Sequence, residues 1–226
     1  MKLENETIQK DYHFTSPVYI TYNPEWVNKI NDICDEIVLN CKTRDKKKLK
    51  EKEKIYGKIG DHGWSYHSSS LINCLGLEEI QSYIGKMSYK ILDEQGFDLT
   101  DYNLSFTEFW VQEFGKKGGG HHDTHTHYDN HISGFYFLKC SNKTSYPVFH
   151  DPRAGSIMTK LPEKKEEDIT LASSKVNYVS KPGTFIFFNS YLPHQFVVDN
   201  GVEPFRFIHF NIQAIRKNLQ ESIIKI

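Results

Sequence analysis

Five of the eleven histidines in the chain lie between His121 and His131, with Asp123 and Asp129 interleaved among them. Imidazole is the commonest metal ligand in proteins, and carboxylates share hard first-row metal ions with it. A glycine-rich turn precedes this run, and an apolar segment typical of a strand follows it at 132–138. The pattern therefore places a candidate metal site at the mouth of a strand.

A lone histidine and an arginine follow further along the chain. His194 comes after a turn, an apolar strand-like segment and a proline, which together bring it to the start of the next strand. Arg206 lies between two phenylalanines, where a guanidinium is costly to bury unless it meets an anion. That anion is either the far carboxylate of a co-substrate or an Asp or Glu side chain. Two neighbouring ligands, a distant histidine and then an arginine is the order expected of a mononuclear iron site with positions open for a co-substrate.

The secondary structure that must position these residues is predicted to change from mostly helices to mostly strands near Asp101. Before it, the sequence predicts a short strand at 17–22, a helix that Asn23 caps and Pro24 begins, and a second helix near 77–95. After it, apolar and alternating segments separated by turns predict strands at 104–114, 132–140, 146–150, 176–180, 184–189, 194–198 and 205–213. Many short strands at close spacing indicate a sandwich or barrel.

Two segments are rich in charge. From Lys42 to Lys54 nearly every residue is charged. Such a run can hold phosphate or an acidic partner, but we expect a solvated loop. We expect the segment at 156–175 to be solvated surface as well, although either segment could frame the opening to a substrate site.

Length and composition limit the class of protein. The 226 residues suit one domain, with mostly helical support over 1–100, a β core over 101–215 and a tail over 216–226. The net charge of −1 argues against nucleic-acid binding by bulk electrostatics. No apolar run is long enough to cross a membrane, the N-terminus lacks the apolar stretch of a signal peptide, and the four cysteines form no CxxC pair. We therefore expect a cytoplasmic protein with reduced thiols and no membrane partner.

The order of these landmarks resembles a family of 2-oxoglutarate/Fe(II)-dependent oxygenases found in bacteria and in tailed phages of marine microbes. The resemblance covers roughly 15–215 and includes a Gly-Trp-Ser stretch at 63–65. The matching landmarks are His125-Thr126-His127, Ser133-Gly134-Phe135-Tyr136-Phe137-Leu138, Asp151-Pro152-Arg153, the Pro-Gly turn and apolar strand at 181–188, His194 and Arg206. Each motif is weak alone, but their order and spacing together are specific.

This resemblance implies both a fold and an activity. The fold is α+β, with a double-stranded β-helix (jelly-roll, cupin-like) core and supporting N-terminal helices. The activity is that of a hydroxylase that uses Fe(II), O2 and 2-oxoglutarate as co-substrate, and that decarboxylates 2-oxoglutarate to succinate. Arg206 would bind the far carboxylate of the co-substrate, and Tyr136 would donate its hydroxyl to it. The cytoplasm of a bacterium or of a phage-infected host cell is the implied location.

Three ligand sets for the metal remain open, and His194 belongs to all of them. The first set is His125, His127 and His194, which the alignment with the family favours. The second combines His127 and Asp129 with His194. The third combines His121, His122 and Asp123 with His194, and both of these sets restore a carboxylate. The first set leaves the metal its full 2+ charge, because all three ligands are neutral.

Two other functions fit the same residues. One is a cupin-like metal-dependent dioxygenase or isomerase that does not use 2-oxoglutarate, in which Arg206 would bind an acidic substrate directly. The other is a jelly-roll binding module without catalytic activity. The primary substrate and the oligomeric state are not readable from the sequence.

Overall fold

Two antiparallel sheets and two long helices make up most of the structure, a computed structural model that describes residues 9–158 and 161–217. The larger sheet has the strand order β1-β8-β5-β10-β3-β2, and the smaller has the order β4-β9-β6-β7. In chain order the elements are β1 (Val18–Tyr22), α1 (Val27–Tyr56), β2 (Ser65–His67), α2 (Glu78–Glu94), β3 (Tyr102–Phe114), β4 (His122–His125), β5 (Ile132–Lys139), β6 (Pro147–His150), α3 (Ala154–Met158), β7 (Lys175–Asn177), β8 (Thr184–Asn189), β9 (His194–Phe196) and β10 (Arg206–Arg216). The α+β jelly-roll prediction is confirmed.

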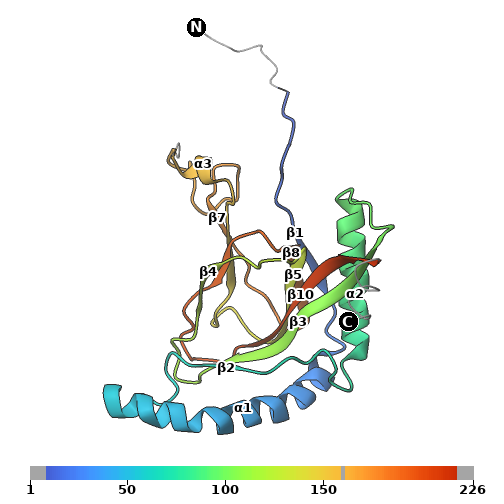
Figure 1. The fold of residues 1–226 in the computed structure, drawn as a ribbon. Coiled ribbons are helices and arrows are strands. Elements are labelled where there is room, and N and C mark those ends of the chain that lie inside the picture. Colours follow the sequence, from blue (N-terminus) through green and yellow to red (C-terminus); the bar gives the residue numbers. More distant parts are fainter. Residues whose placement is uncertain (1–8, 159–160, 218–226) are drawn as a thin grey trace.

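The larger sheet is buried on both faces, because the helices cover one face and the smaller sheet covers the other (Figure 1). Successive side chains of a strand point to opposite faces. Along β10, Ile208 and Phe210 therefore pack with the helices, whereas Phe207 packs between the sheets against Phe196 of β9. We call these two sides the helix-facing side and the inner side. Which side a residue occupies decides whether it can reach the metal site.

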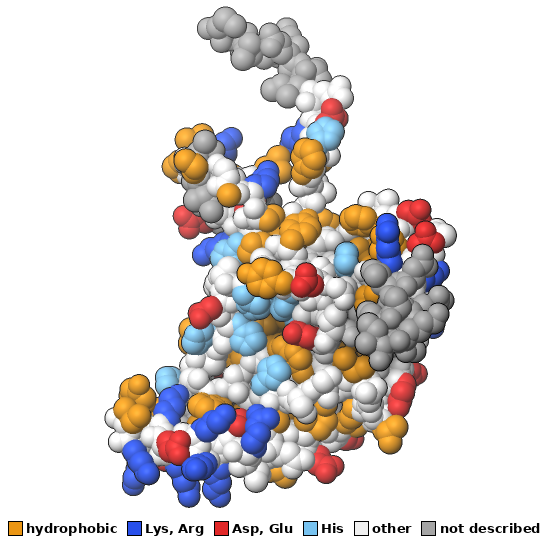
Figure 2. Space-filling model, viewed as in Figure 1, with side chains coloured by type: hydrophobic (Ala, Val, Ile, Leu, Met, Phe, Trp, Pro, Cys, Tyr) orange, Lys and Arg blue, Asp and Glu red, His pale blue; other side chains and the backbone are white. Residues whose placement is uncertain are grey.

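Helix α1 runs through the charged segment at 42–54, which corrects the prediction of a loop there. Lys, Glu and Arg are strong helix formers, and a surface helix needs only one buried stripe. That stripe extends into the charged segment through Cys41 and Asp45, and the buried Asp45 carboxylate accepts hydrogen bonds from Arg44 and from the Trp64 indole. Lys46, Lys47, Lys48, Lys50 and Lys54 are exposed. Lys and Arg side chains gather over the C-terminal part of α1 in Figure 2.

Most other predicted elements occur within a few residues of their predicted bounds. Helix α2 and strands β3, β5, β6 and β8 agree closely. The first helix starts at Val27 rather than Pro24, because Asn23 Oδ1 accepts a hydrogen bond from the Glu25 amide in a turn that precedes it. The predicted tail at 216–226 lies mostly outside the described residues, and β10 continues to Arg216. Within the described part of the chain, no helix is both long and apolar enough to cross a membrane.

Candidate metal centre

Three histidines converge where β4 and β9 meet. The two strands pair antiparallel with His125 directly opposite His194, and His127 follows two residues after the end of β4. One ring nitrogen from each of the three lies within 4.8 Å of the others, and His127 Nε2 is 3.3 Å from His194 Nε2. Histidine side chains gather in the middle of the face drawn in Figure 2. Three donor nitrogens at this separation fit a single first-row metal ion.

Backbone carbonyls orient two of these rings. His125 Nδ1 is 2.7 Å from the Asp123 carbonyl oxygen, and His194 Nδ1 is 3.0 Å from the Leu192 carbonyl oxygen. A carbonyl oxygen only accepts, so each Nδ1 carries the proton and each Nε2 keeps its lone pair. This is the arrangement that fixes a metal-binding histidine, since the nitrogen that does not bind the metal is held by an acceptor. Both rings are therefore set for ligation through Nε2.

Burial keeps the imidazoles of His194 and His127 neutral. His194 is enclosed by the rings of Phe135, Phe149 and Phe188, and burial lowers its pKa to about 2. Burial likewise lowers the pKa of His127 to about 3, with the neighbouring histidines adding to the effect. A metal ligand must be unprotonated, so this pocket supplies lone pairs throughout the physiological pH range.

We expect the metal-free protein to lose stability steeply as the pH falls below 6.5. His194, His127 and His122, whose pKa burial lowers to about 4, stay neutral in the folded chain and bind protons in the unfolded chain. Between pH 6.5 and 4 the unfolded state therefore holds more protons, and the free energy of unfolding falls with pH at up to about 4 kcal/mol per unit for three such groups.

Urea unfolding of the metal-free protein at several pH values between 7.5 and 5 measures this slope. His122 lies among Phe114, Phe196 and Phe207, so a His122→Phe variant should keep the fold and lose about a third of the slope. A free energy of unfolding that stays constant over this range would contradict the neutral, buried state of the three rings.

The two aspartates of the histidine run point away from the centre. The Asp123 side chain is 97% exposed and lies 3.7 Å from the exposed His121. Asp129 is also exposed, at a backbone φ of 57°. Among the described residues, neither carboxylate joins a group of donors close enough to share a metal ion. Of the three ligand sets left open by the sequence, the structure brings together the donors of the first.

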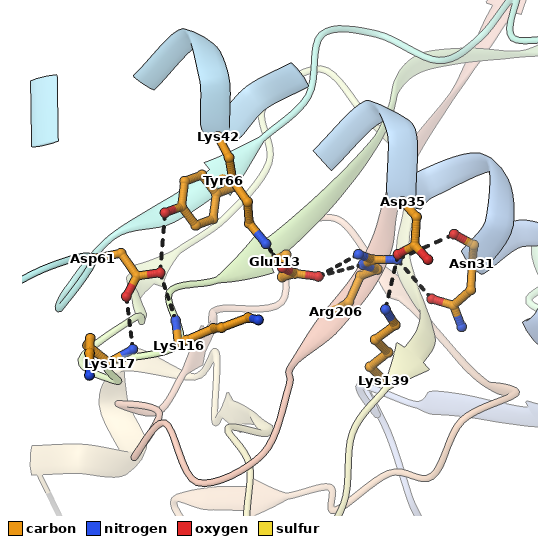
Figure 3. A network of polar contacts seen from close by, with 10 residues as sticks. All are labelled: Asn31, Asp35, Lys42, Asp61, Tyr66, Glu113, Lys116, Lys117, Lys139 and Arg206. Atoms are coloured by element: carbon orange, nitrogen blue, oxygen red, sulfur yellow. Dashed lines mark hydrogen bonds and ion pairs between the residues drawn. The ribbon is translucent and has the colours of Figure 1, made fainter. Parts of the chain in front are cut away.

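Arg206 lies on the helix-facing side, which corrects the expectation that it reaches a co-substrate beside the histidines. Its guanidinium contacts Asp35 Oδ1 through Nη1 at 2.6 Å and Glu113 Oε2 through Nη2 at 2.6 Å (Figure 3). Lys42 approaches Glu113 from α1 at 2.5 Å. The bond to Arg206 is the main factor that lowers the pKa of Asp35. The structure thus gives Arg206 the ion-pair alternative, in which it joins α1 to strands β3 and β10.

Tyr136 also faces away from the metal site, because successive side chains of β5 point to opposite sides of the sheet. Its ring stacks on Phe185 at 4.1 Å, and its hydroxyl donates to the Asn23 carbonyl oxygen at 2.9 Å on the helix-facing side. The neighbours that face inward are Phe135 and Phe137. The expectation that Tyr136 contacts the co-substrate therefore does not agree with this geometry.

Sequence reasoning missed polar groups on the inner side of β3. Glu108 lies near His127 and His209, and these three residues form a second group with donor atoms within 4.8 Å of one another. Gln112 lies on the same side, with Nε2 2.6 Å from His122 Nε2. The alternation along 104–114 was the available signal, because it places Glu108, Trp110 and Gln112 on one face.

The antiparallel sheets and the histidine centre between them are typical of a jelly-roll metalloprotein. Residues 108–211 match the family model described as "Putative 2OG-Fe(II) oxygenase". The match spans the part of the chain that carries the centre, and the resemblance to this family seen in the sequence is confirmed. The family implies Fe(II), 2-oxoglutarate and O2, and the protein is an enzyme of the 2-oxoglutarate/Fe(II)-dependent dioxygenase class.

The chain is similar to several solved structures at low sequence identity. The non-heme alpha ketoglutarate dependent carbocyclase SnoK from nogalamycin biosynthesis aligns with a TM-score of 0.54 and 9% identity, over 87% of this chain and 79% of that chain. The viral collagen prolyl hydroxylase of Paramecium Bursaria Chlorella virus-1 aligns with a TM-score of 0.48 and 13% identity, over 94% and 98%. A Pseudomonas putida prolyl-4-hydroxylase aligns with a TM-score of 0.48 and 12% identity, over 88% and 94%. No curated protein sequence matches the chain.

Proposed function

We propose that the protein hydroxylates a substrate, still to be identified, with Fe(II) held by His125, His127 and His194 and with decarboxylation of 2-oxoglutarate to succinate. The observation that carries this proposal is the convergence of three ring nitrogens within the segment that matches the family. Bound at such a centre, Fe(II) supplies positions at which a 2-oxo acid and dioxygen are brought together.

The residues around the centre prepare it for an anionic co-substrate. Imidazole binds a metal as a neutral ligand, so three such ligands leave the full 2+ charge of the metal to attract the dianionic 2-oxoglutarate. Phe135, Phe149 and Phe188 pack around His194 and keep water from that side of the site. Exclusion of water strengthens the attraction between the metal and the co-substrate carboxylate.

Polar side chains of the inner side are our proposed partners for the far carboxylate of the co-substrate. His122 and Gln112 contact each other near His125, and Ser65 of β2 lies within hydrogen-bond distance of Gln112. Gln112 is buried, and its amide Nε2 is the atom that can donate a hydrogen bond to a carboxylate. These groups are neutral donors, and hydrogen bonds to a carboxylate from neutral donors are weaker than those from a guanidinium. We therefore propose that the metal chelate, more than the far carboxylate, determines the affinity for 2-oxoglutarate.

A second candidate function is a metal-dependent dioxygenase or isomerase that does not use 2-oxoglutarate. One observation favours it over the use of 2-oxoglutarate: Arg206 is the only buried Lys or Arg among the described residues, and its guanidinium faces α1 rather than the metal centre, where it would bind a far carboxylate. In this second function, too, Arg206 would not contact the substrate, unlike the role expected from the sequence. We rank this function second, because the family match supports 2-oxoglutarate as the co-substrate.

Succinate formation distinguishes the two candidates. We expect the protein supplied with Fe(II), ascorbate, O2 and 2-oxoglutarate to form succinate slowly even without its substrate, and His125→Ala to reduce the rate at least about 100-fold through loss of a metal ligand. His121→Ala is the matched control, since His121 belongs to the same run but is exposed and outside the centre. Equal rates in wild type and His125→Ala would contradict the proposal.

The organisation and location of the protein are also proposals. We propose that 1–226 forms a single oxygenase domain, because α1 and α2 share one apolar cluster with the larger sheet. We propose a reducing, cytoplasmic compartment, and the four free cysteines support it.

A further inference from the structure

Glu108 lies on the inner side of the larger sheet, next to a bulge in β3. The pairing of β3 with β10 shifts register between Asn211 and Ile212, which leaves Thr107 as an extra residue. Because of this shift, Phe106 and Phe109 both pack on the helix-facing side, with their rings 5.4 Å apart. Glu108 then lies next to Asn211 of β10 and accepts a hydrogen bond from its amide nitrogen at 2.7 Å.

Two histidines meet this carboxylate from different directions. His209 projects from β10 with Nε2 3.3 Å from Glu108 Oε2. The ring of His127 lies 4.8 Å from the ring of His209, and its Nδ1 is 3.1 Å from the Asn211 amide nitrogen. One donor atom from each of Glu108, His127 and His209 lies within 4.8 Å of the other two.

His209 has an unsatisfied nitrogen at this position. The residue is 1% exposed, between the rings of Trp110 and Phe135, and its Nε2 has no hydrogen-bond partner in the described part of the chain. The 3.3 Å contact with Glu108 lacks the alignment of a hydrogen bond. A buried polar atom without a partner costs about 1–3 kcal/mol, so its retention requires an explanation. A metal ion is a partner that such a nitrogen can bind.

We propose that Glu108, His127 and His209 form a second cation site that shares His127 with the first. Two imidazoles and one carboxylate suit Fe(II), Co(II), Zn(II) and Mn(II), and they form the 2-His-1-carboxylate type of donor set. The Glu108 side chain is 48% exposed, so a cation can enter from solvent. This inference goes beyond the proposed function, because it assigns a second position to the metal.

Sharing of His127 makes the two sites mutually exclusive. A neutral imidazole has one lone pair, on either Nδ1 or Nε2. His127 Nε2 faces His194 of the first set, whereas Nδ1 faces Asn211 and Glu108 of the second. A cation in the second site therefore removes His127 from the first, and excess divalent cation draws the protein away from its active arrangement.

Anaerobic titration with Co(II), followed by its visible absorption and by calorimetry, tests the second site in a His194→Ala background that lacks the first. We expect this variant to bind one equivalent of Co(II), and addition of Glu108→Gln to weaken binding at least 10-fold. The amide oxygen that Glu108→Gln introduces can still accept the hydrogen bond from Asn211, so the fold is retained. His209→Phe, which places a ring among Trp110 and Phe135, should weaken binding similarly. Asp123→Asn, which removes an exposed carboxylate outside both sets, should leave it unchanged.

Two results would overturn the inference. One is that His194→Ala binds no Co(II) at millimolar concentration, or binds it equally with and without Glu108→Gln. The other is that the wild-type protein binds two equivalents of Co(II) at once, which would disprove mutual exclusion. Because the decisive titration uses a variant without the first site and requires no turnover, its outcome is independent of the proposed oxygenase activity.

Discussion

Replacing Arg206 with methionine should lower the free energy of unfolding by about 3 kcal/mol and leave 2-oxoglutarate binding by the folded protein unchanged. The Arg206 side chain is 3% exposed, and it pairs with Glu113, which is 7% exposed, and with Asp35 of α1. Its removal leaves the buried Glu113 carboxylate with Lys42 as its remaining ion-pair partner among the described residues. Loss of one member of a buried ion pair costs more than the pair itself contributes, because the other charge stays buried.

Thermal unfolding and a 2-oxoglutarate titration of the same variant provide the measurement. A loss of about 3 kcal/mol corresponds to a fall in Tm of roughly 6–12 °C for a chain of this size. Lys90→Met is the matched control, because Lys90 pairs with Glu94 at the surface of α2, with side chains 66% and 53% exposed, and its loss should cost less than about 1 kcal/mol. An unchanged Tm combined with a large loss of 2-oxoglutarate affinity would instead show that Arg206 binds the co-substrate.

Replacing His194 with alanine should weaken Fe(II) binding more than about 100-fold. Loss of a residue that merely orients a metal ligand costs roughly 10- to 100-fold in affinity, and loss of the ligand itself costs more. His194 is the most buried of the three histidines at the centre, at 1% exposed, and the Leu192 carbonyl holds its ring with Nε2 directed toward His127.

Anaerobic equilibrium dialysis against Fe(II) measures this effect, with His121→Ala as the control in the same run. The weak Fe(II) binding that remains in His194→Ala should depend on Glu108 as a ligand. It should therefore disappear when Glu108→Gln is added. Equal Fe(II) affinity in wild type and His194→Ala would show that His194 is not a metal ligand. It would thereby contradict all three ligand sets derived from the sequence, because each of them contains His194.

The sequence predicted the β core because the strands of the larger sheet are apolar on both sides. A strand such as Thr184–Asn189, which is buried along its whole length, reads as a continuous apolar run. The same property explains why the roles predicted for Arg206 and Tyr136 do not agree with their positions in the structure. When both faces of a strand are apolar, alternation does not reveal which face points inward, and a shift of one residue moves a side chain from the metal centre to α1.

The metal centre itself could be anticipated, because two of its histidines are close in sequence and the third begins a strand directly after a turn. His125 and His127 are two residues apart, and His194 begins the strand that pairs with β4. Glu108 and His209 could not be found in this way. Their contact depends on the pairing of β3 with β10, which joins segments roughly a hundred residues apart.

Helix α1 shows that a run of charged residues does not by itself indicate a solvated loop. The charged run at 42–54 contains residues that favour helices, and its buried stripe includes a charged residue, Asp45, as well as Cys41. An apolar pattern alone therefore ends near Val38, although the helix continues to Tyr56. The ion pair of Asp45 with Arg44, together with the hydrogen bond from Trp64, allows a carboxylate to occupy a core position.

The central claim is that three histidines hold an iron ion to which 2-oxoglutarate binds directly. Anaerobic addition of 2-oxoglutarate to the Fe(II)-loaded protein tests it, because a 2-oxo acid that chelates Fe(II) gives a visible charge-transfer absorption that neither component has alone. We predict that this absorption appears in wild type and in folded Arg206→Met, and is absent in His194→Ala at the same Fe(II) concentration. If wild type gives no such absorption, or His194→Ala gives it at full strength, the three-histidine centre is not the site at which 2-oxoglutarate binds iron.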